Sequence, residues 1–204
     1  MAKFVIVDDN SSLVEAFRLM FFCNEYGELI DFYTIKETSD YLKKYHKDIE
    51  ILLLDISLDG QNSLKILDEY SDKIKIIMLS GTSDEDLIRY CYKAGCKAFI
   101  RKDLNNREIL DIIDKVLNGE IDQVKYNNIE KDESLLSNEQ KVMKGVLYDL
   151  TNIEIGKIYH ISESTVKKTL SGLYNKFGLT YDSSDPKKIR EEALREYFIN
   201  YYNA

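Results

Sequence analysis

Hydrophobic residues in the first 118 positions alternate between short continuous runs and stripes with helical spacing. The runs are expected to form five strands: Lys3–Asp8, Leu29–Tyr33, Ile51–Asp55, Ile74–Ser80 and Ala98–Ile100. Runs this continuous are typical of strands buried on both faces. Between them, residues such as Leu13, Phe17 and Met20–Phe21 recur with helical spacing. Residues 1–118 are therefore predicted to form an α/β domain, a flavodoxin-like, doubly wound five-stranded parallel sheet.

The pattern changes after residue 118. Residues 119–134 are polar with no clean period, which is typical of a linker, and from residue 135 onward only helical spacing is found. Asn152 is expected to cap a short helix and Ser162 the next one, with a turn at His160–Ile161 between them. Residues 135–204 are therefore predicted to form an all-α four-helix domain with helix-turn-helix spacing.

Composition and charge narrow the possible classes of protein. The chain has 204 residues and a net charge of −8; residues 135–204 carry ten Lys and Arg against nine Asp and Glu, so +1, which leaves −9 for residues 1–134. No apolar run approaches the roughly 18 residues of a membrane span, and no secretory signal is evident. Three cysteines without such a signal are typical of reduced thiols, so a cytoplasmic protein with no membrane partner is expected.

Carboxylates cluster at the predicted strand ends. Asp8 and Asp9 end the first run, and Asp55 ends the third. In the strand order 2-1-3-4-5, the first and third strands are neighbours, so the three carboxylates converge where ligands bind in such sheets. Like charges this close repel each other, and a hard divalent cation such as Mg²⁺ relieves the repulsion. The backbone carbonyl of Ser57 is a candidate for a further ligand.

Two further strand ends carry a hydroxyl and an ammonium group. Ser80 ends the fourth run and Lys102 follows the fifth. A carboxylate beside a cation and a lysine can accept a phosphoryl group, because both positive charges neutralise the phosphoryl oxygens. Asp55 is the expected phosphoacceptor because Asp8 and Asp9 serve the metal, and Ser80 offers a hydroxyl to the adduct.

The stretches VIVDDN, LLLDISLDG, IIMLSG and AGCKAFIRKD together resemble the receiver domain of two-component response regulators, over residues 3–118. The resemblance implies phosphorylation of Asp55 by a histidine kinase or a small phosphodonor. It also implies self-phosphorylation and slow autodephosphorylation only, without other enzyme activity. Phe99 matches the family's aromatic switch residue, although by side-chain type alone simple core packing is the better explanation of a phenylalanine. Ser63 stands where the family usually has glycine.

The predicted helix that begins at Ser162 has an apolar side, so its polar side faces outward. Lysines there can bind phosphates, and hydroxyl and amide groups can read base edges. The candidate DNA-binding residues are Lys167, Lys168, Thr169, Ser171, Asn175 and Lys176. A solvated helical face without a nucleic-acid partner explains the same residues.

The run ISESTVKKTLSGLYNKFGL resembles the DNA-binding domain of LuxR-type regulators. With the receiver, it matches the NarL/FixJ class, which implies transcription control by phosphorylation, double-stranded DNA as partner and a homodimer when active. Thr169 replaces a usual histidine. Gly172 lies within the recognition helix, where glycine lowers helix stability by about 1 kcal/mol relative to alanine. The alternative is a phosphorylation-controlled adaptor whose helical domain binds protein.

Overall fold

The computed structural model describes residues 3–58, 61–81, 84–120, 137–179 and 186–202. The chain folds as two compact units, Met1–Glu130 and Lys131–Ala204. The division falls in the stretch 119–134 predicted as a linker, of which residues 121–134 lie outside the described ranges. None of the helices in those ranges combines the length and the apolar character that crossing a bilayer requires.

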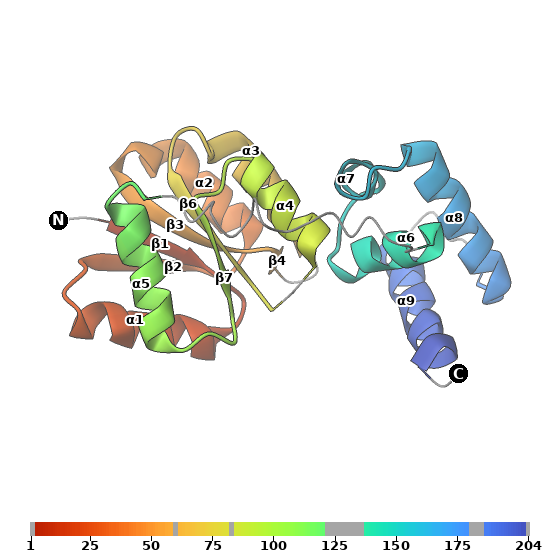
Figure 1. Cartoon of the computed structure of the whole chain (residues 1–204), viewed down its shortest axis with the longest axis horizontal. Coiled ribbons are helices and arrows are strands. Elements are labelled where there is room, and N and C mark those ends of the chain that lie inside the picture. Colours follow the sequence, from red (N-terminus) through yellow and green to blue (C-terminus); the bar gives the residue numbers. More distant parts are fainter. Residues whose placement is uncertain (1–2, 59–60, 82–83, 121–136, 180–185, 203–204) are drawn as a thin grey trace. The chain divides into compact units, whose positions relative to one another are not determined.

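The first unit is built on a five-stranded parallel sheet (Figure 1). Its order is β2-β1-β3-β6-β7, with β1 (Lys3–Val7), β2 (Glu28–Phe32), β3 (Ile49–Asp55), β6 (Lys75–Ser80) and β7 (Ala98–Arg101). Val7 pairs with Leu54, and Asp55 with Leu79, so β1, β3 and β6 end almost level with one another. The predicted flavodoxin-like sheet and its strand order are confirmed.

Helices cover both faces of this sheet (Figure 1). They are α1 (Ser11–Cys23), α2 (Ile35–Tyr45), α3 (Leu64–Tyr70), α4 (Glu85–Lys93) and α5 (Asn106–Leu117), with a 3₁₀ turn η1 (His46–Asp48). On one face, Phe17 of α1 and Ile113 of α5 share a core with Phe4 of β1 and Leu53 of β3. Residues on either side of Leu53 are equally buried because successive strand residues point to opposite layers.

Two loops at the strand ends are held by helix caps. After β1, the side chain of Asn10 accepts hydrogen bonds from the backbone N–H groups of Ser12 (3.1 Å) and Leu13 (3.2 Å). After β6, Asp84 accepts from the N–H of Leu87 at 3.2 Å. These bonds satisfy donors that a helix start leaves unpaired, and they fix where each helix leaves the sheet.

A small hairpin that the sequence analysis did not predict follows β3. β4 (Ser57–Leu58) and β5 (Gln61–Asn62) pair antiparallel. The hairpin leads back to Ser63, whose N–H donates to the Ile56 carbonyl at 2.8 Å. The chain beyond Asp55 is therefore folded back against the end of its own strand.

The second unit is helical in its described residues, as predicted. It contains α6 (Asn138–Leu147), α7 (Asn152–Ile158), α8 (Glu163–Lys176) and α9 (Pro186–Tyr202). α8 packs on α6 and α7, and Val142, Val166 and Leu170 are buried between them.

Two glycines allow close backbone approach in this unit, Gly145 between α6 and α7 and Gly156 between α7 and the turn that follows it. A Cβ placed on Gly145 would lie 2.3 Å from Cγ1 of Ile155, and one on Gly156 would lie 2.8 Å from the carbonyl oxygen of Ile161.

The cap of α7 is Thr151 instead of the predicted Asn152. The Thr151 hydroxyl accepts from the Glu154 N–H at 3.3 Å, and the Glu154 carboxylate accepts from the Thr151 N–H at 2.7 Å. This reciprocal pair satisfies two donors at once, so the helix starts one residue earlier than a cap at Asn152 allows. Ser162 caps α8 as predicted, accepting from the Thr165 N–H at 3.0 Å, and His160 turns with φ 56°.

Candidate functional site

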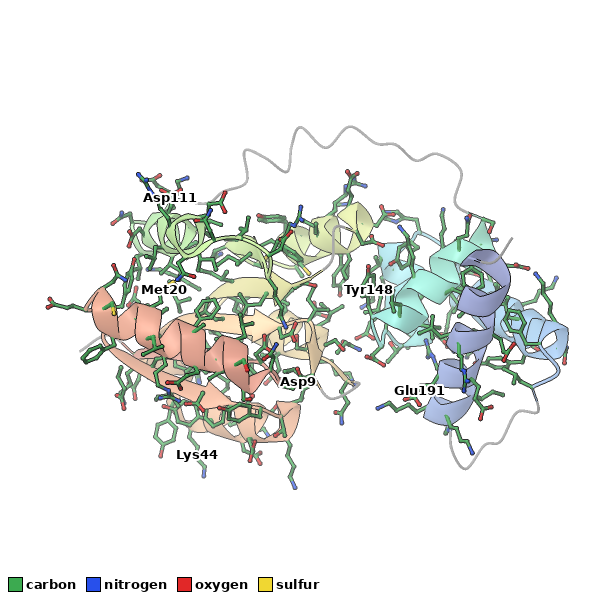
Figure 2. The ribbon with its side chains drawn as sticks, turned by 90° about the horizontal axis from the view of Figure 1, so that it is seen from below. Asp9, Met20, Lys44, Asp111, Tyr148 and Glu191 are labelled. Carbon is green, nitrogen blue, oxygen red and sulfur yellow. The ribbon has the colours of Figure 1, made fainter. Side chains whose placement is uncertain are left out.

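Three carboxylates meet at the carboxyl edge of the parallel sheet. Asp8 and Asp9 follow β1 and Asp55 ends the neighbouring β3, so the sheet itself brings them together. One carboxylate oxygen from each lies within 4.8 Å of the others. Asp8 is fully buried and Asp55 is 5% exposed, whereas Asp9 is exposed at the N-terminal end of α1 (Figure 2). The cluster is therefore open to solvent on the Asp9 side.

Lys102 bridges two of these carboxylates. Its Nζ lies 2.7 Å from Oδ2 of Asp55 and 2.8 Å from Oδ2 of Asp8. Oδ1 of Asp8 accepts from the Asn10 N–H at 2.9 Å, and the Lys102 ammonium lies beside its buried Oδ2. Three carboxylates against one ammonium give a formal excess of two negative charges in a partly enclosed site.

Burial is the largest single influence on the pKa values of Asp55 and Lys102. It raises the pKa of Asp55 to about 6, against the lowering effect of the Lys102 ammonium and with a smaller contribution from the charges of Asp8 and Asp9. Burial also acts to lower the pKa of Lys102, but hydrogen bonds and charge from Asp55 and Asp8 outweigh it and hold that pKa above its usual value. At neutral pH, Asp55 is thus an ionised but unusually basic carboxylate.

Other predicted site residues lie around this cluster. Ser80 ends β6 and is 7% exposed, and its carbonyl accepts from the Lys102 N–H at 2.9 Å, so both residues share the same sheet edge. Ser57 is in β4, two residues beyond Asp55. Phe99 is half-buried on β7, opposite Met78 and three residues before Lys102.

Ser63 is a site residue to which sequence reasoning gave no role. It is fully buried, and its hydroxyl donates to the backbone carbonyl of Asp55. The Ile56 N–H donates to the Leu79 carbonyl at 3.2 Å. Both the carbonyl and the N–H of the peptide between Asp55 and Ile56 are therefore hydrogen-bonded. The signal was present in the sequence as a hydroxyl where receivers usually have glycine.

The predicted nucleic-acid face of α8 is mostly exposed. Thr169 is half-buried, and the exposed members are Lys167, Lys168, Ser171, Asn175 and Lys176. Lys167 Nζ lies 2.6 Å from Glu163, and Lys176 Nζ lies 3.5 Å from Glu139. Part of the positive charge is therefore neutralised within the unit.

An open groove of about 650 Å³ runs between α8 and the start of α6. Residues 137–139 form one wall, and Thr165, Lys168, Thr169 and Gly172 of α8 form the other. Three hydroxyl groups, one amide, one carboxylate and one ammonium group line the groove, together with apolar surface.

Known proteins resemble both units. Residues 4–114 match the family model described as response regulator receiver domain, and residues 133–184 match bacterial regulatory proteins, luxR family. The transcriptional regulatory protein ComA of Bacillus subtilis (strain 168) is 24% identical over 200 residues, which cover 88% of this chain and 92% of ComA.

Two solved structures share the fold. RcsB from Salmonella enterica serovar Typhimurium, bound to promoter rprA with the phosphomimetic BeF₃⁻, gives a TM-score of 0.63 at 15% identity over 93% of this chain and 98% of RcsB. The CheX–CheY–BeF₃⁻–Mg²⁺ complex from Borrelia burgdorferi gives 0.53 at 24% identity over 56% and 88%. With its receiver domain followed by a LuxR-type DNA-binding domain, this chain belongs to the response regulators, in the NarL/FixJ class.

Proposed function

We propose that phosphorylation of Asp55 controls DNA binding by the helical unit, and hence transcription. The observation that carries this proposal is the convergence of Asp8, Asp9, Asp55 and Lys102 at one sheet edge, in a chain that also has a LuxR-type unit.

The reaction at Asp55 is a phosphoryl transfer. A carboxylate oxygen of Asp55 attacks the phosphorus of a kinase phosphohistidine or a small acyl phosphate. A new P–O bond forms while the donor's bond to phosphorus breaks, and the leaving group keeps the electron pair. The Lys102 ammonium, already 2.7 Å from Asp55, neutralises charge on the phosphoryl oxygens. The chain is thereby its own substrate, so we expect only self-phosphorylation and slow autodephosphorylation.

The carboxylates suit Mg²⁺, which would neutralise further charge on the phosphoryl group. Asp8, Asp9 and Asp55 supply the oxygen ligands that this ion prefers, and the excess of two negative charges favours a cation. The similar CheX–CheY structure contains Mg²⁺ with BeF₃⁻. The Ser57 carbonyl is the proposed backbone ligand, as part of the hairpin that follows Asp55.

Intact-mass spectrometry tests the acceptor. With Mg²⁺ and a small phosphodonor, the chain should gain about 80 Da per phosphoryl group, and hydroxylamine should remove it. Asp55→Asn should abolish the gain. Asp40→Asn, on an exposed carboxylate paired with Lys43 at 3.2 Å, should leave it intact. Full modification of the Asp55→Asn protein would show that another residue is the acceptor.

Ser80 and Phe99 are the proposed switch residues. A phosphoryl group at Asp55 should draw in the Ser80 hydroxyl, and the half-buried Phe99 ring should then repack. Because α4 and the turn after it lie between their strands, residues 90–97 should change contacts with a second receiver or with the helical unit. Hydrogen exchange with and without BeF₃⁻ checks this, and unchanged protection across 84–105 at full occupancy would contradict it.

For the output, we propose that the exposed face of α8 contacts double-stranded DNA as a homodimer on paired half-sites. RcsB, which has the same fold, was solved on promoter DNA. A histidine kinase as phosphodonor and the chromosome as target imply that the protein acts in the cytoplasm, and we propose this location. The near-neutral charge of residues 135–204 implies weak binding as a monomer, which is why two copies are needed.

Fluorescence anisotropy on a selected duplex tests the output. Lys168→Ala should flatten the slope of log affinity against log salt by about one unit. Lys157→Ala, an exposed lysine on α7, should not. The ion pairs of Lys167 and Lys176 favour the alternative, a protein-binding adaptor, because they reduce the positive field. Failure of the folded, phosphorylated chain to bind any member of a randomised duplex library would contradict DNA binding and favour that alternative.

A further inference from the structure

Gly172 is a helix-interior glycine for which the described part of its unit shows no packing requirement. A Cβ placed there meets no heavy atom of the described residues within 4 Å, and the residue has an ordinary helical backbone. Other glycines of the unit have internal reasons. Gly145 and Gly156 face close neighbours, and Gly178 has φ +68°.

Glycine at such a position weakens the helix more than any residue except proline. Where a glycine is needed neither for backbone conformation nor for internal packing, close approach of the backbone to another molecule is a recognised use of it. Gly172 lies in the groove between α8 and α6, beside Lys168 and Thr169. The missing side chain thus leaves room in that groove.

The donor groups on the α8 wall of the groove suit a phosphate ligand. Thr165, Lys168 and Thr169 offer hydroxyl and ammonium donors, which are typical partners of phosphate oxygens. Gly172 is tenth of the fourteen residues of α8, beyond the N-terminal part from which a recognition helix reaches base edges. We propose that the sugar–phosphate backbone of one DNA strand passes through this groove and meets α8 at Gly172. This inference rests on the proposed DNA-binding function.

The groove wall formed by residues 137–139 contains a negative charge. Glu139 lines the groove, and its carboxylate is only loosely neutralised by Lys176, at 3.5 Å. A phosphate strand in the groove would be repelled by Glu139. The carboxylate should therefore limit DNA affinity.

The first test uses helix-favouring side chains at Gly172 in the full chain. Gly172→Ala should raise the melting temperature by about 4 °C, because it strengthens an exposed helix. The same change should weaken binding to a selected duplex about tenfold, equivalent to about 1.4 kcal/mol. Gly172→Leu should weaken it further while remaining folded. Higher stability combined with lower affinity cannot come from unfolding.

The second test removes the opposing charge. Glu139→Gln should tighten duplex binding by about twofold to fivefold. Glu191→Gln is the matched control, because it removes one charge from the same unit and breaks a similar pair, with Lys187 at 3.9 Å, outside the groove. It should change affinity less than Glu139→Gln.

The outcomes separate the two proposals. If wild type binds the duplex and both Gly172 variants bind as tightly or more tightly, the groove does not hold the strand, although the DNA-binding function stands. Equal effects of Glu139→Gln and Glu191→Gln also overturn the inference. If wild type binds no duplex, the proposed function itself fails.

Discussion

Lys102 and Lys75 form ion pairs of nearly equal length but different burial. Replacing each of them with methionine therefore separates the effect of burial on the stability contributed by the pair from the effect of distance. Lys102 Nζ lies 2.7 Å from Asp55 Oδ2, and Lys75 Nζ lies 2.6 Å from Glu50 Oε1. The side chain of Asp55 is 7% exposed, whereas that of Glu50 is 42% exposed. Methionine keeps the length of the side chain and removes the charge.

The two substitutions should lower the free energy of unfolding by amounts that differ severalfold. An exposed pair such as Lys75–Glu50 contributes about 0–1 kcal/mol to the free energy of unfolding. Removing Lys102 leaves Asp8 and Asp55 buried without their ammonium, and breaking a buried pair costs about 3–5 kcal/mol. Because the Lys102 side chain is 25% exposed, water reduces this cost, and we expect about 3 kcal/mol.

Urea unfolding of the full chain, followed by circular dichroism in the presence of EDTA, measures both losses. With a slope of about 2 kcal/mol/M, Lys102→Met should lower the midpoint of the first unit by about 1.5 M and Lys75→Met by less than about 0.5 M. Added Mg²⁺ should restore more stability to Lys102→Met than to Lys75→Met, because it replaces the missing cation. Equal midpoint shifts would refute the view that burial decides the contribution of this lysine.

Two other changes test packing and the acceptor backbone. Gly145→Ala should lower the free energy of unfolding by about 1–2 kcal/mol, since the new methyl group overlaps Ile155, whereas Gly172→Ala should raise it. Thermal melts of both variants check this, and a stabilised Gly145→Ala protein would contradict the packing. Ser63→Ala should cost about 1–3 kcal/mol, because the Asp55 carbonyl loses its hydroxyl donor. Urea melts of Ser63→Ala and of Ser63→Thr, which keeps the hydroxyl, measure this loss, and equal stability of Ser63→Ala and wild type would exclude the bond.

The strands were predictable because their apolar residues gather in short runs, most of which stop at a polar residue. The run Ile51–Asp55, for example, lies within the observed β3. The β4–β5 hairpin was not predictable, because two-residue strands have no periodicity to detect. Thr151 and Asn152 are both good caps, and only the reciprocal bond with Glu154 decides between them.

The candidate site likewise contains features that were predictable from the sequence and features that were not. Convergence of Asp8 with Asp55 follows from strand order, which the alternating pattern predicts. The placement of Lys102 between both carboxylates depends on how the loop after β7 packs, and the Ser63 bond depends on the unpredicted hairpin. Such contacts join residues 8 to 94 positions apart, and no local pattern records them.

The two close glycine contacts of the second unit also limit which residues related proteins can have at these positions. Position 145 meets the side chain of Ile155, so a larger residue there can be accommodated when position 155 becomes smaller, and the two should vary together among related proteins. Position 156 meets the backbone carbonyl of Ile161, which no substitution at a neighbouring position can shrink. Related chains that keep this turn should therefore exchange volume freely between positions 145 and 155 but retain glycine at position 156.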